Sequence, residues 1–268
     1  MYALFLGIVQ GATEFAPISS SGHLVLVPWL LRWPQPELVF DTTLHLGTLA
    51  AVLAFFWRDC LKLLVAWWES GRRRRLHSSE ARIAWGILVG TIPAALLGYL
   101  FEDFFAAFFG SPLWVAVFLL ITGMILALSE RLGRREHGLE AMTWTRALCI
   151  GLAQVMAILP GISRSGVTIG AGLALGFKRD AAARFSFLLS IPIILGSGIF
   201  KLLDFLKAEN ASLSASNLLV GFTAAAISGY LCIKLLLSFL QRGRLYAFVV
   251  YCWAAGLSIL LLLLLRGG

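Results

Sequence analysis

Long apolar runs separated by short polar stretches dominate this chain. A helix needs roughly 20 residues to cross the ~30 Å hydrocarbon layer of a bilayer, and several runs approach that length. They predict membrane-spanning helices over residues 38–58, 83–101, 113–132, 184–206, 216–239 and 246–266. Since 59% of the residues are hydrophobic and only 13% are charged, the composition excludes an ordinary soluble domain. We therefore expect an all-α integral membrane protein.

The first thirty residues and the segment 145–177 break this pattern. In the first, Gln10, Glu14, Pro17 and three consecutive serines interrupt the apolar sequence, and no basic start marks a signal peptide. Irregular backbone at membrane depth is tolerated only where protein or water satisfies its polar groups. We interpret both segments as re-entrant helical hairpins, the second built from residues 145–160 and 165–177.

The two hairpins are related by an internal repeat with a constant offset of 144 residues. The matching positions are Gly7, Gln10 and residues 19–22 in the first copy and Gly151, Gln154 and residues 163–166 in the second. Each half, about 1–140 and 141–268, would hold one hairpin and three spans. Because three is odd, the second half starts on the opposite face of the membrane, which predicts an inverted-topology repeat within a single membrane domain, 1–268. In such folds the two polar loops meet near the midplane.

Basic residues outnumber acidic ones and give a formal net charge of +8. In a membrane protein their positions matter more than their sum, because cytoplasmic loops are enriched in Lys and Arg. All the basic clusters fall on one face of the predicted topology, and Glu102 with Asp103 falls on the other. The clusters are Arg72–Arg75, Arg131 with Arg134 and Arg135, Lys178 with Arg179 and Arg184, and Arg242 with Arg244. We expect this face to be cytoplasmic, with no role in binding nucleic acid.

The first loop combines a carboxylate, hydroxyls and an imidazole. Gln10 and Glu14 are four residues apart and share a helix face, where their oxygens could hold Mg²⁺ or Ca²⁺. For nucleophilic attack we favour Ser20, with His23 as general base and then acid. Direct attack by His23 or by water is the alternative, and Glu14 could instead serve only as a cap or as a structural partner of Arg164. The neighbouring Ser19 and Ser21 are candidate phosphate ligands.

The second loop supplies positive charge. Arg164 lies among hydroxyl-bearing residues, and its guanidinium matches the geometry of a phosphate group. If a helix begins near Ser165, its free amides would also point at an anion. Ser163, Arg164, Ser165 and Thr168 are therefore the predicted phosphate ligands of this loop. The alternative is that the small residues serve only close helix packing and that Arg164 snorkels to the interface.

These two motifs resemble those of a known family. Gln10-xxx-Glu14 followed by Pro-Ile-Ser-Ser-Ser-Gly-His, together with Pro-Gly-Ile-Ser-Arg-Ser-Gly-Val-Thr at 160–168, is similar to the undecaprenyl-diphosphate phosphatases of bacteria, the bacitracin-resistance type. Phe56-Trp57-Arg58 and Phe185–Pro192 extend the likeness over essentially the whole chain. In that family the functional residues correspond to Glu14 with Gln10, His23 and Arg164, the first position being Glu in some members.

The resemblance implies a multi-pass hydrolase of the bacterial plasma membrane. Its substrate would be undecaprenyl diphosphate, from which it removes one phosphate to give the lipid carrier of peptidoglycan synthesis. The partners we expect are this polyprenyl lipid and the bilayer, and a homodimer is compatible with the resemblance. From the loop placement we favour a site that opens to the outer face, where the first hairpin enters.

Two other classes share some of these features. A polyprenyl-phosphate flippase or an anion transporter would also use an inverted repeat with Arg and a carboxylate at the midplane. A phosphatidic-acid-type phosphatase has a Ser-Gly-His element, but this chain lacks the accompanying Lys-x6-Arg-Pro run. His45, within the first predicted span, either adjoins the site or is simply a packed, hydrogen-bonded residue.

Overall fold

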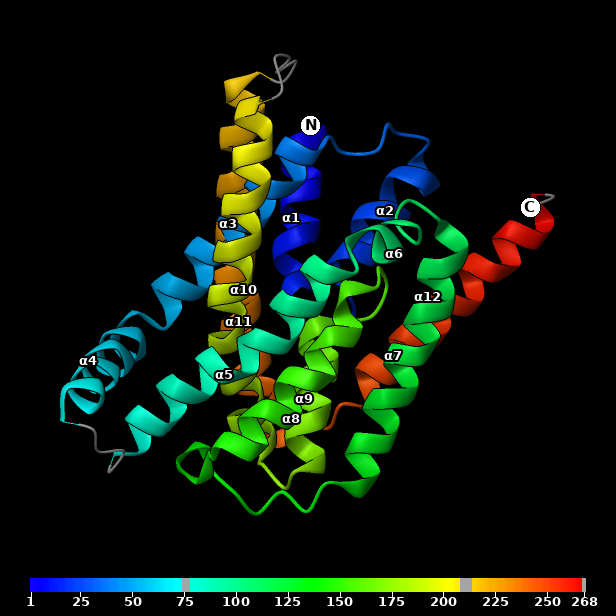
Figure 1. The fold of residues 1–268 in the computed structure, drawn as a ribbon. Coiled ribbons are helices and arrows are strands. Elements are labelled where there is room, and N and C mark those ends of the chain that lie inside the picture. The colour runs from blue at the N-terminus through cyan, green and yellow to red at the C-terminus, as the bar shows by residue number, and fades with distance from the viewer. Residues whose placement is uncertain (74–77, 208–213, 267–268) are drawn as a thin grey trace.

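A computed structural model describes residues 1–73, 78–207 and 214–266 of the chain (Figure 1). Arg74 and Arg75 of the basic cluster Arg72–Arg75 lie outside the described residues. The described part is a bundle of α-helices with two short 3₁₀ turns. The helices are α1 (Tyr2–Glu14), α2 (Ser20–Leu31), α3 (Leu38–Phe55), α4 (Trp57–Arg73), α5 (Ser79–Leu100), α6 (Glu102–Ala106), α7 (Pro112–Leu132), α8 (Trp144–Val155), α9 (Arg164–Ala174), α10 (Arg179–Lys207), α11 (Ala215–Arg242) and α12 (Tyr246–Leu265), and the turns are η1 (Leu139–Ala141) and η2 (Met156–Ile158).

Within the described residues, six helices are long and apolar enough to cross a membrane. They are α3, α5, α7, the segment Arg179–Ile199 of α10, α11 and α12. Each overlaps one of the predicted spans, so the prediction of an all-helical membrane protein with six spans is confirmed. The helix ends follow local chemistry: Ser78 caps α5 by accepting the amide of Ala81 at 3.1 Å, and Pro112 opens α7.

The first predicted span, 38–58, ends earlier than expected. Residues up to Arg73 belong to α4, a separate helix that starts directly after α3 ends at Phe55 and packs against α5. The chain turns at Phe56, so residues 56–58 do not continue the first span. Charged residues follow the apolar run here, and this amphipathic mixture lowers the mean hydropathy without breaking the helix.

The first short helix of each sequence half packs against a long helix of the other half. α1 packs along α11 of the second half, and its repeat counterpart α8 packs along α5 of the first half. Both contacts depend on glycine: a Cβ on Gly7 would lie 2.6 Å from the carbonyl oxygen of Gly221, and one on Gly151 would lie 2.7 Å from the Cα of Gly90. The repeated glycines therefore allow helix backbones to touch at equivalent places.

The residues before and after each pair of short helices, α1–α2 and α8–α9, lie close together. At the second pair, the amide of Lys178 donates to the carbonyl of His137 at 2.8 Å. At the first pair, the hydroxyl of Tyr2 donates to the carbonyl of Pro34 at 3.2 Å, and the rings of Tyr2 and Trp33 lie 5.4 Å apart. At 13, 12, 12 and 11 residues, α1, α2, α8 and α9 are shorter than a membrane crossing requires.

A buried carboxylate ties the helix ends together on the basic face. Glu130, at the end of α7, accepts hydrogen bonds from Arg135, from Arg179 at the start of α10 and from the amide of Leu245 before α12. A buried charge is stable only when it is paired in this way. Glu130 therefore fixes the positions of α7, α10 and α12 relative to one another.

Candidate functional site

The two Ser/Gly loops have the same internal hydrogen bonds, 144 residues apart. Ser19 caps α2 by accepting the amide of Gly22 at 3.3 Å, and Ser163 caps α9 by accepting the amide of Gly166 at 3.0 Å. The hydroxyls of residues 19 and 21 lie 3.3 Å apart, and those of residues 163 and 165 lie 3.1 Å apart. Ser19 holds a positive φ of 70°, and the second loop places its positive φ at Gly161. The repeat seen in the sequence thus produces two similar helix starts.

The loops touch each other. The hydroxyl of Ser165 donates to the carbonyl of Ala16 at 3.0 Å, which joins the second loop to the first. Thr122 on α7 supports the second loop, because its hydroxyl donates to Gly161 and accepts the amide of Ser163, both at 3.1 Å. The first turns of α2 and α9 consequently start beside one another, and the free amides and positive dipole end of each favour an anion there.

A charged cluster lies where the loops meet. One carboxylate oxygen of Glu14 is 3.0 Å from the guanidinium of Arg164, and the other accepts hydrogen bonds from Ser20 at 2.5 Å and from the side-chain amide of Gln10 at 2.8 Å. The imidazole of His45 on α3 is 3.9 Å from the same oxygen. The side chain of Glu14 is only 6% exposed and that of Arg164 is 13% exposed. The structure therefore brings together the buried Gln10 and Glu14 with the partly exposed Ser20 and Arg164.

His23 faces away from Ser20. Its Nδ1 lies 2.7 Å from the carbonyl of Ser19, and its Nε2 lies 2.6 Å from the hydroxyl of Tyr251 on α12. A carbonyl only accepts, so Nδ1 carries the proton and, in the neutral ring, Nε2 accepts from Tyr251. The predicted pairing of Ser20 with His23 as its base is therefore not formed in this structure. The hydroxyl of Ser20 donates to Glu14 instead.

Exposure divides the predicted phosphate ligands into two groups. Ser20, Ser21 and Arg164 are partly exposed and can be reached by a ligand. The other four are buried in hydrogen bonds within the protein: Ser19, Ser163, Ser165 and Thr168. These four shape the loops in the observed geometry and do not face an open space.

Of three further residues near the cluster, two were not predicted from the sequence, and for the third, His45, the sequence left two roles possible. Ser186 on α10 accepts from Arg164 through its carbonyl at 3.3 Å and shares a hydrogen bond with Thr168 at 2.7 Å. Tyr251 holds His23, and His45 adjoins Glu14. His45 interrupts an apolar span, which was a usable signal, whereas Ser186 and Tyr251 belong to helices in which such residues are ordinary.

The cluster offers oxygen atoms to a cation. Gln10 is buried, and its Oε1 has no hydrogen-bond partner, although its amide nitrogen contacts Glu14. An amide oxygen beside a carboxylate is a donor set that suits Mg²⁺ or Ca²⁺. Among the described residues there is no group of three or more His, Cys, Asp or Glu side chains placed to hold a metal ion. A cation here would therefore share its shell with water or with a ligand.

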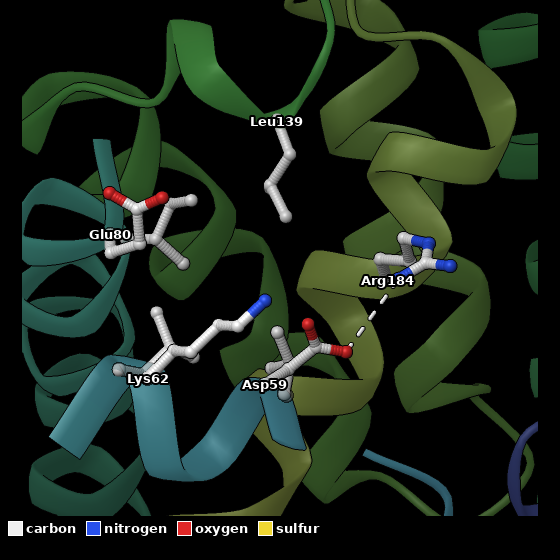
Figure 2. A pocket seen from close by; sticks show the side chains of 8 residues that line it. Asp59, Lys62, Glu80, Leu139 and Arg184 are labelled. Carbon is white, nitrogen blue, oxygen red and sulfur yellow. Dashed lines mark ion pairs between the residues drawn. The ribbon is translucent and has the colours of Figure 1, made fainter. Parts of the chain in front are cut away.

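The cluster lies apart from the small charged pocket of Figure 2. That pocket, of about 160 Å³, lies between α4, α5, η1 and the start of α10 and is lined by Asp59, Lys62, Glu80, Leu139 and Arg184 among others. None of the predicted site residues lines it. A second, apolar pocket borders α11 and α12 at Leu235 and Phe248 and reaches the back of α1 at Ala12.

Membrane-length helices, together with two short helix pairs that meet at a buried carboxylate and guanidinium, define a polytopic membrane protein with an internal polar site. The model of one family, described as bacitracin resistance protein BacA, matches residues 3–258. The chain belongs to this family, and the resemblance read from the two motifs is confirmed.

Bacterial relatives named undecaprenyl-diphosphatase match the chain over nearly its full length. The protein of Thermomicrobium roseum is 47% identical, with 97% of this chain and 96% of the relative covered. That of Geobacter sulfurreducens is 45% identical with 99% of both covered, and that of Geotalea daltonii is 44% identical with 95% and 94% covered. With the six apolar helices, these relatives identify a multi-pass protein of the bacterial plasma membrane.

Proposed function

We propose that this chain is a phosphatase that hydrolyses undecaprenyl diphosphate to undecaprenyl phosphate and inorganic phosphate. The observation that carries the proposal is the contact of Ser20, Glu14 and Arg164 at the paired helix starts. This contact places a hydroxyl, a carboxylate that can act as a base and a guanidinium that can hold phosphate next to one another. The names of the relatives support the same activity. The names of these relatives do not favour the flippase or transporter alternative.

We assign the nucleophile to Ser20 and its base to Glu14. The Ser20 oxygen attacks the terminal phosphorus and forms a Ser–O–P bond, while its proton passes to the carboxylate 2.5 Å away. The bond from this phosphorus to the bridging oxygen breaks, and undecaprenyl phosphate leaves with the electron pair. Water then attacks the phosphoserine, inorganic phosphate leaves, and Ser20 regains a proton from Glu14.

Arg164 and the helix starts hold the substrate. The substrate brings several negative charges, which must be balanced before a nucleophile can approach. When the diphosphate binds, the guanidinium of Arg164 shifts part of its interaction from Glu14 to phosphate oxygens, which frees the carboxylate to accept the proton of Ser20. His23, in the first turn of α2, and Tyr251 on α12 position this helix start.

Gln10 and Glu14 would hold a Mg²⁺ or Ca²⁺ ion. The unpartnered Oε1 of Gln10 and the carboxylate of Glu14 suit such an ion. When bound, the cation would neutralise charge on the diphosphate. Since an amide oxygen carries no net charge, the ion would be held more weakly than by two carboxylates.

The architecture we propose is an inverted-topology repeat with two re-entrant hairpins, α1–α2 and α8–α9. It is supported by the adjacent ends of each pair, by the short lengths of these helices and by the crosswise contacts α1 with α11 and α8 with α5. The site then lies near the midplane and opens to the outer face. Assembly as a homodimer stays a prediction.

The test of function is phosphate release from undecaprenyl diphosphate by the purified protein. Release should require Mg²⁺ or Ca²⁺, stop on addition of a chelator and resume when the cation is restored. Asp59→Asn is a matched control, because it removes a carboxylate from a half-exposed ion pair outside the site. A folded protein that releases no phosphate under these conditions contradicts the proposal.

A further inference from the structure

α4 presents an exposed apolar stripe that the bundle does not cover. The stripe consists of Trp57, Leu61, Leu64, Val65 and Trp68, each more than half exposed. Their spacing of three or four residues places them along one side of the helix. A row of large apolar side chains of this kind does not face water without a partner.

A charged stripe runs beside the apolar one. Arg58, Glu69 and Arg72 are exposed and follow the adjoining side of α4, whereas Lys62 points into the pocket of Figure 2. With two cations and one anion, this stripe carries a net positive charge. An apolar side next to a basic side is the pattern of a helix that lies in the plane of a membrane surface, with its polar side toward the headgroups.

The third side of α4 is seated on the bundle. The side chain of Ser70 accepts from the indole of Trp85 on α5 at 3.1 Å, and the carboxylate of Asp59 is 3.8 Å from Arg184 on α10. Figure 2 shows Asp59 and Lys62 of α4 opposite Glu80 of α5 and Arg184. The orientation of the helix is thus fixed, so its two exposed stripes face outward.

Tryptophans mark the depth of α4. The rings of Trp67 and Trp85 are 6.0 Å apart, as are those of Trp85 and Trp144, and Trp68 lies next to them at 6.4 Å from Trp67. Indoles collect at the boundary between hydrocarbon and water. α4 also joins the end of α3 to the start of α5, and in the topology proposed above both of these ends lie on the face that carries the basic clusters.

From these features we infer that α4 is an interfacial helix that binds the anionic lipids of the cytoplasmic leaflet. Its apolar stripe enters the boundary of the acyl chains, and Arg58 and Arg72 contact phosphate headgroups. Charge complementarity selects this occupant, since a negatively charged leaflet attracts basic residues next to a membrane span. The inference is independent of the proposed phosphatase activity.

The experiment measures which lipid surrounds α4. A chain with its native cysteines replaced by alanine carries Leu64→Cys labelled with bimane, in nanodiscs of equal parts phosphatidylglycerol and phosphatidylcholine. Doxyl groups are attached to one lipid or to the other. Quenching at position 64 should be stronger with doxyl-phosphatidylglycerol, whereas a label at Leu257→Cys on the exposed side of α12 should be quenched equally by both.

Charge variants test the cause. Arg58→Gln with Arg72→Gln leaves only Glu69 on the stripe, which then has no positive charge, and should bring the quenching ratio down to one or below. The matched pair Arg242→Gln and Arg244→Gln, on the same face but outside α4, should leave the ratio unchanged. Raising the salt concentration should also lower the quenching ratio, because salt screens exposed charges. This measurement needs no substitution, so it tests the inference even if a charge variant fails to fold.

Other results overturn the inference. Equal quenching of position 64 by both lipids removes the preference for anionic lipid. No quenching by either lipid, with disulfide crosslinking between two copies of the Leu64→Cys chain, places a second copy on the stripe. Strong quenching of position 64 by aqueous iodide, equal to that of a label at Glu69→Cys, places the stripe in water.

Discussion

The carboxylate of Glu14 lies 3.0 Å from the guanidinium of Arg164, although 150 residues separate them in the chain. The contact joins the end of α1 to the first residue of α9, so it also joins the two copies of the repeat. The repeat counterpart of Glu14 is Ile158, and that of Arg164 is Ser20. Matching backbones therefore carry different side chains at these positions: Glu14, Ser20 and Arg164 differ from their counterparts, whereas the fourth member of the cluster, Gln10, matches Gln154.

Replacing Arg164 with glutamine should lower phosphate release by about 10²–10³-fold, because one preorganised group that balances charge in the transition state is lost. Removing one partner of a buried ion pair also destabilises a protein, by about 3–5 kcal/mol. The double variant Glu14→Gln with Arg164→Gln leaves no unpaired charge, so comparing its Tm with that of Arg164→Gln measures the destabilisation that comes from the unpaired carboxylate; its turnover is not compared, because Glu14 is the proposed base. Near-normal turnover of a folded Arg164→Gln variant would contradict the assigned role, and Arg184→Ala is the control because its ion pair is half exposed.

Ser20→Ala should abolish a covalent phosphoenzyme and nearly all turnover. Labelled substrate and rapid acid quenching should trap phosphoserine at position 20 in the unaltered protein. Ser21→Ala is a matched control, because Ser21 is also partly exposed but contacts Ser19 and not Glu14. Phosphohistidine at position 23, sought in a parallel alkaline quench because acid hydrolyses it, would transfer the nucleophile to His23, and oxygen exchange without any covalent intermediate would support direct attack by water.

Hydropathy was sufficient to predict the spans, because crossing a bilayer demands a long apolar run in each helix. The polar loops were also readable, since Glu14 and Arg164 are costly in hydrocarbon and stand out from it. Their contact followed from the repeat and not from either motif alone. The interfacial position of α4 was not foreseen, because its charged stripe lowers the hydropathy to that of a connector.

The role of His23 could not be derived from its place in the motif. Three residues separate it from Ser20, which allowed a contact on a helix, but the capped start of α2 turns the imidazole toward Ser19 and Tyr251. Tyr251 comes from α12, more than two hundred residues away, and nothing in the local sequence marks it. Such long-range contacts depend on how the helices pack, and the packing partners of a helix cannot be read from a single sequence.

Tyr251→Phe should lower kcat by about five- to tenfold, the effect of losing roughly one hydrogen bond to the imidazole. The phenyl ring keeps the stacking on His23, whose centroid is 5.7 Å from that of Tyr251, so the fold should persist. Phosphoserine should still form in this variant. Tyr246→Phe, which changes another tyrosine of α12, serves as the control, and equal effects of the two substitutions would argue against a specific role of Tyr251.

Gln10→Glu should raise the affinity for Mg²⁺ or Ca²⁺, since a second carboxylate beside Glu14 adds charge to the ligand set. Without cation, the two carboxylates repel each other, so the Tm of this variant should rise more on addition of metal than that of the unaltered protein. Gln154→Glu is the matched control, because Gln154 is the repeat counterpart of Gln10 and also has a buried Oε1 without a partner. Similar metal-dependent shifts of Tm in both variants would contradict a metal site at Gln10.

The inverted topology predicts which loops an impermeant thiol reagent reaches. If α1–α2 is a re-entrant hairpin from the outer face, Gln35→Cys should be labelled in intact cells, as should Glu102→Cys on the acidic side. If α8–α9 enters from the cytoplasm, Glu140→Cys and Lys178→Cys, which flank it, should react only after permeabilisation. All four residues are exposed, so accessibility reports membrane side and not burial. Labelling of Gln35→Cys and Lys178→Cys from the same side would mean that at least one short helix pair crosses the membrane, because two hairpins entering from opposite faces cannot share flanks on one side.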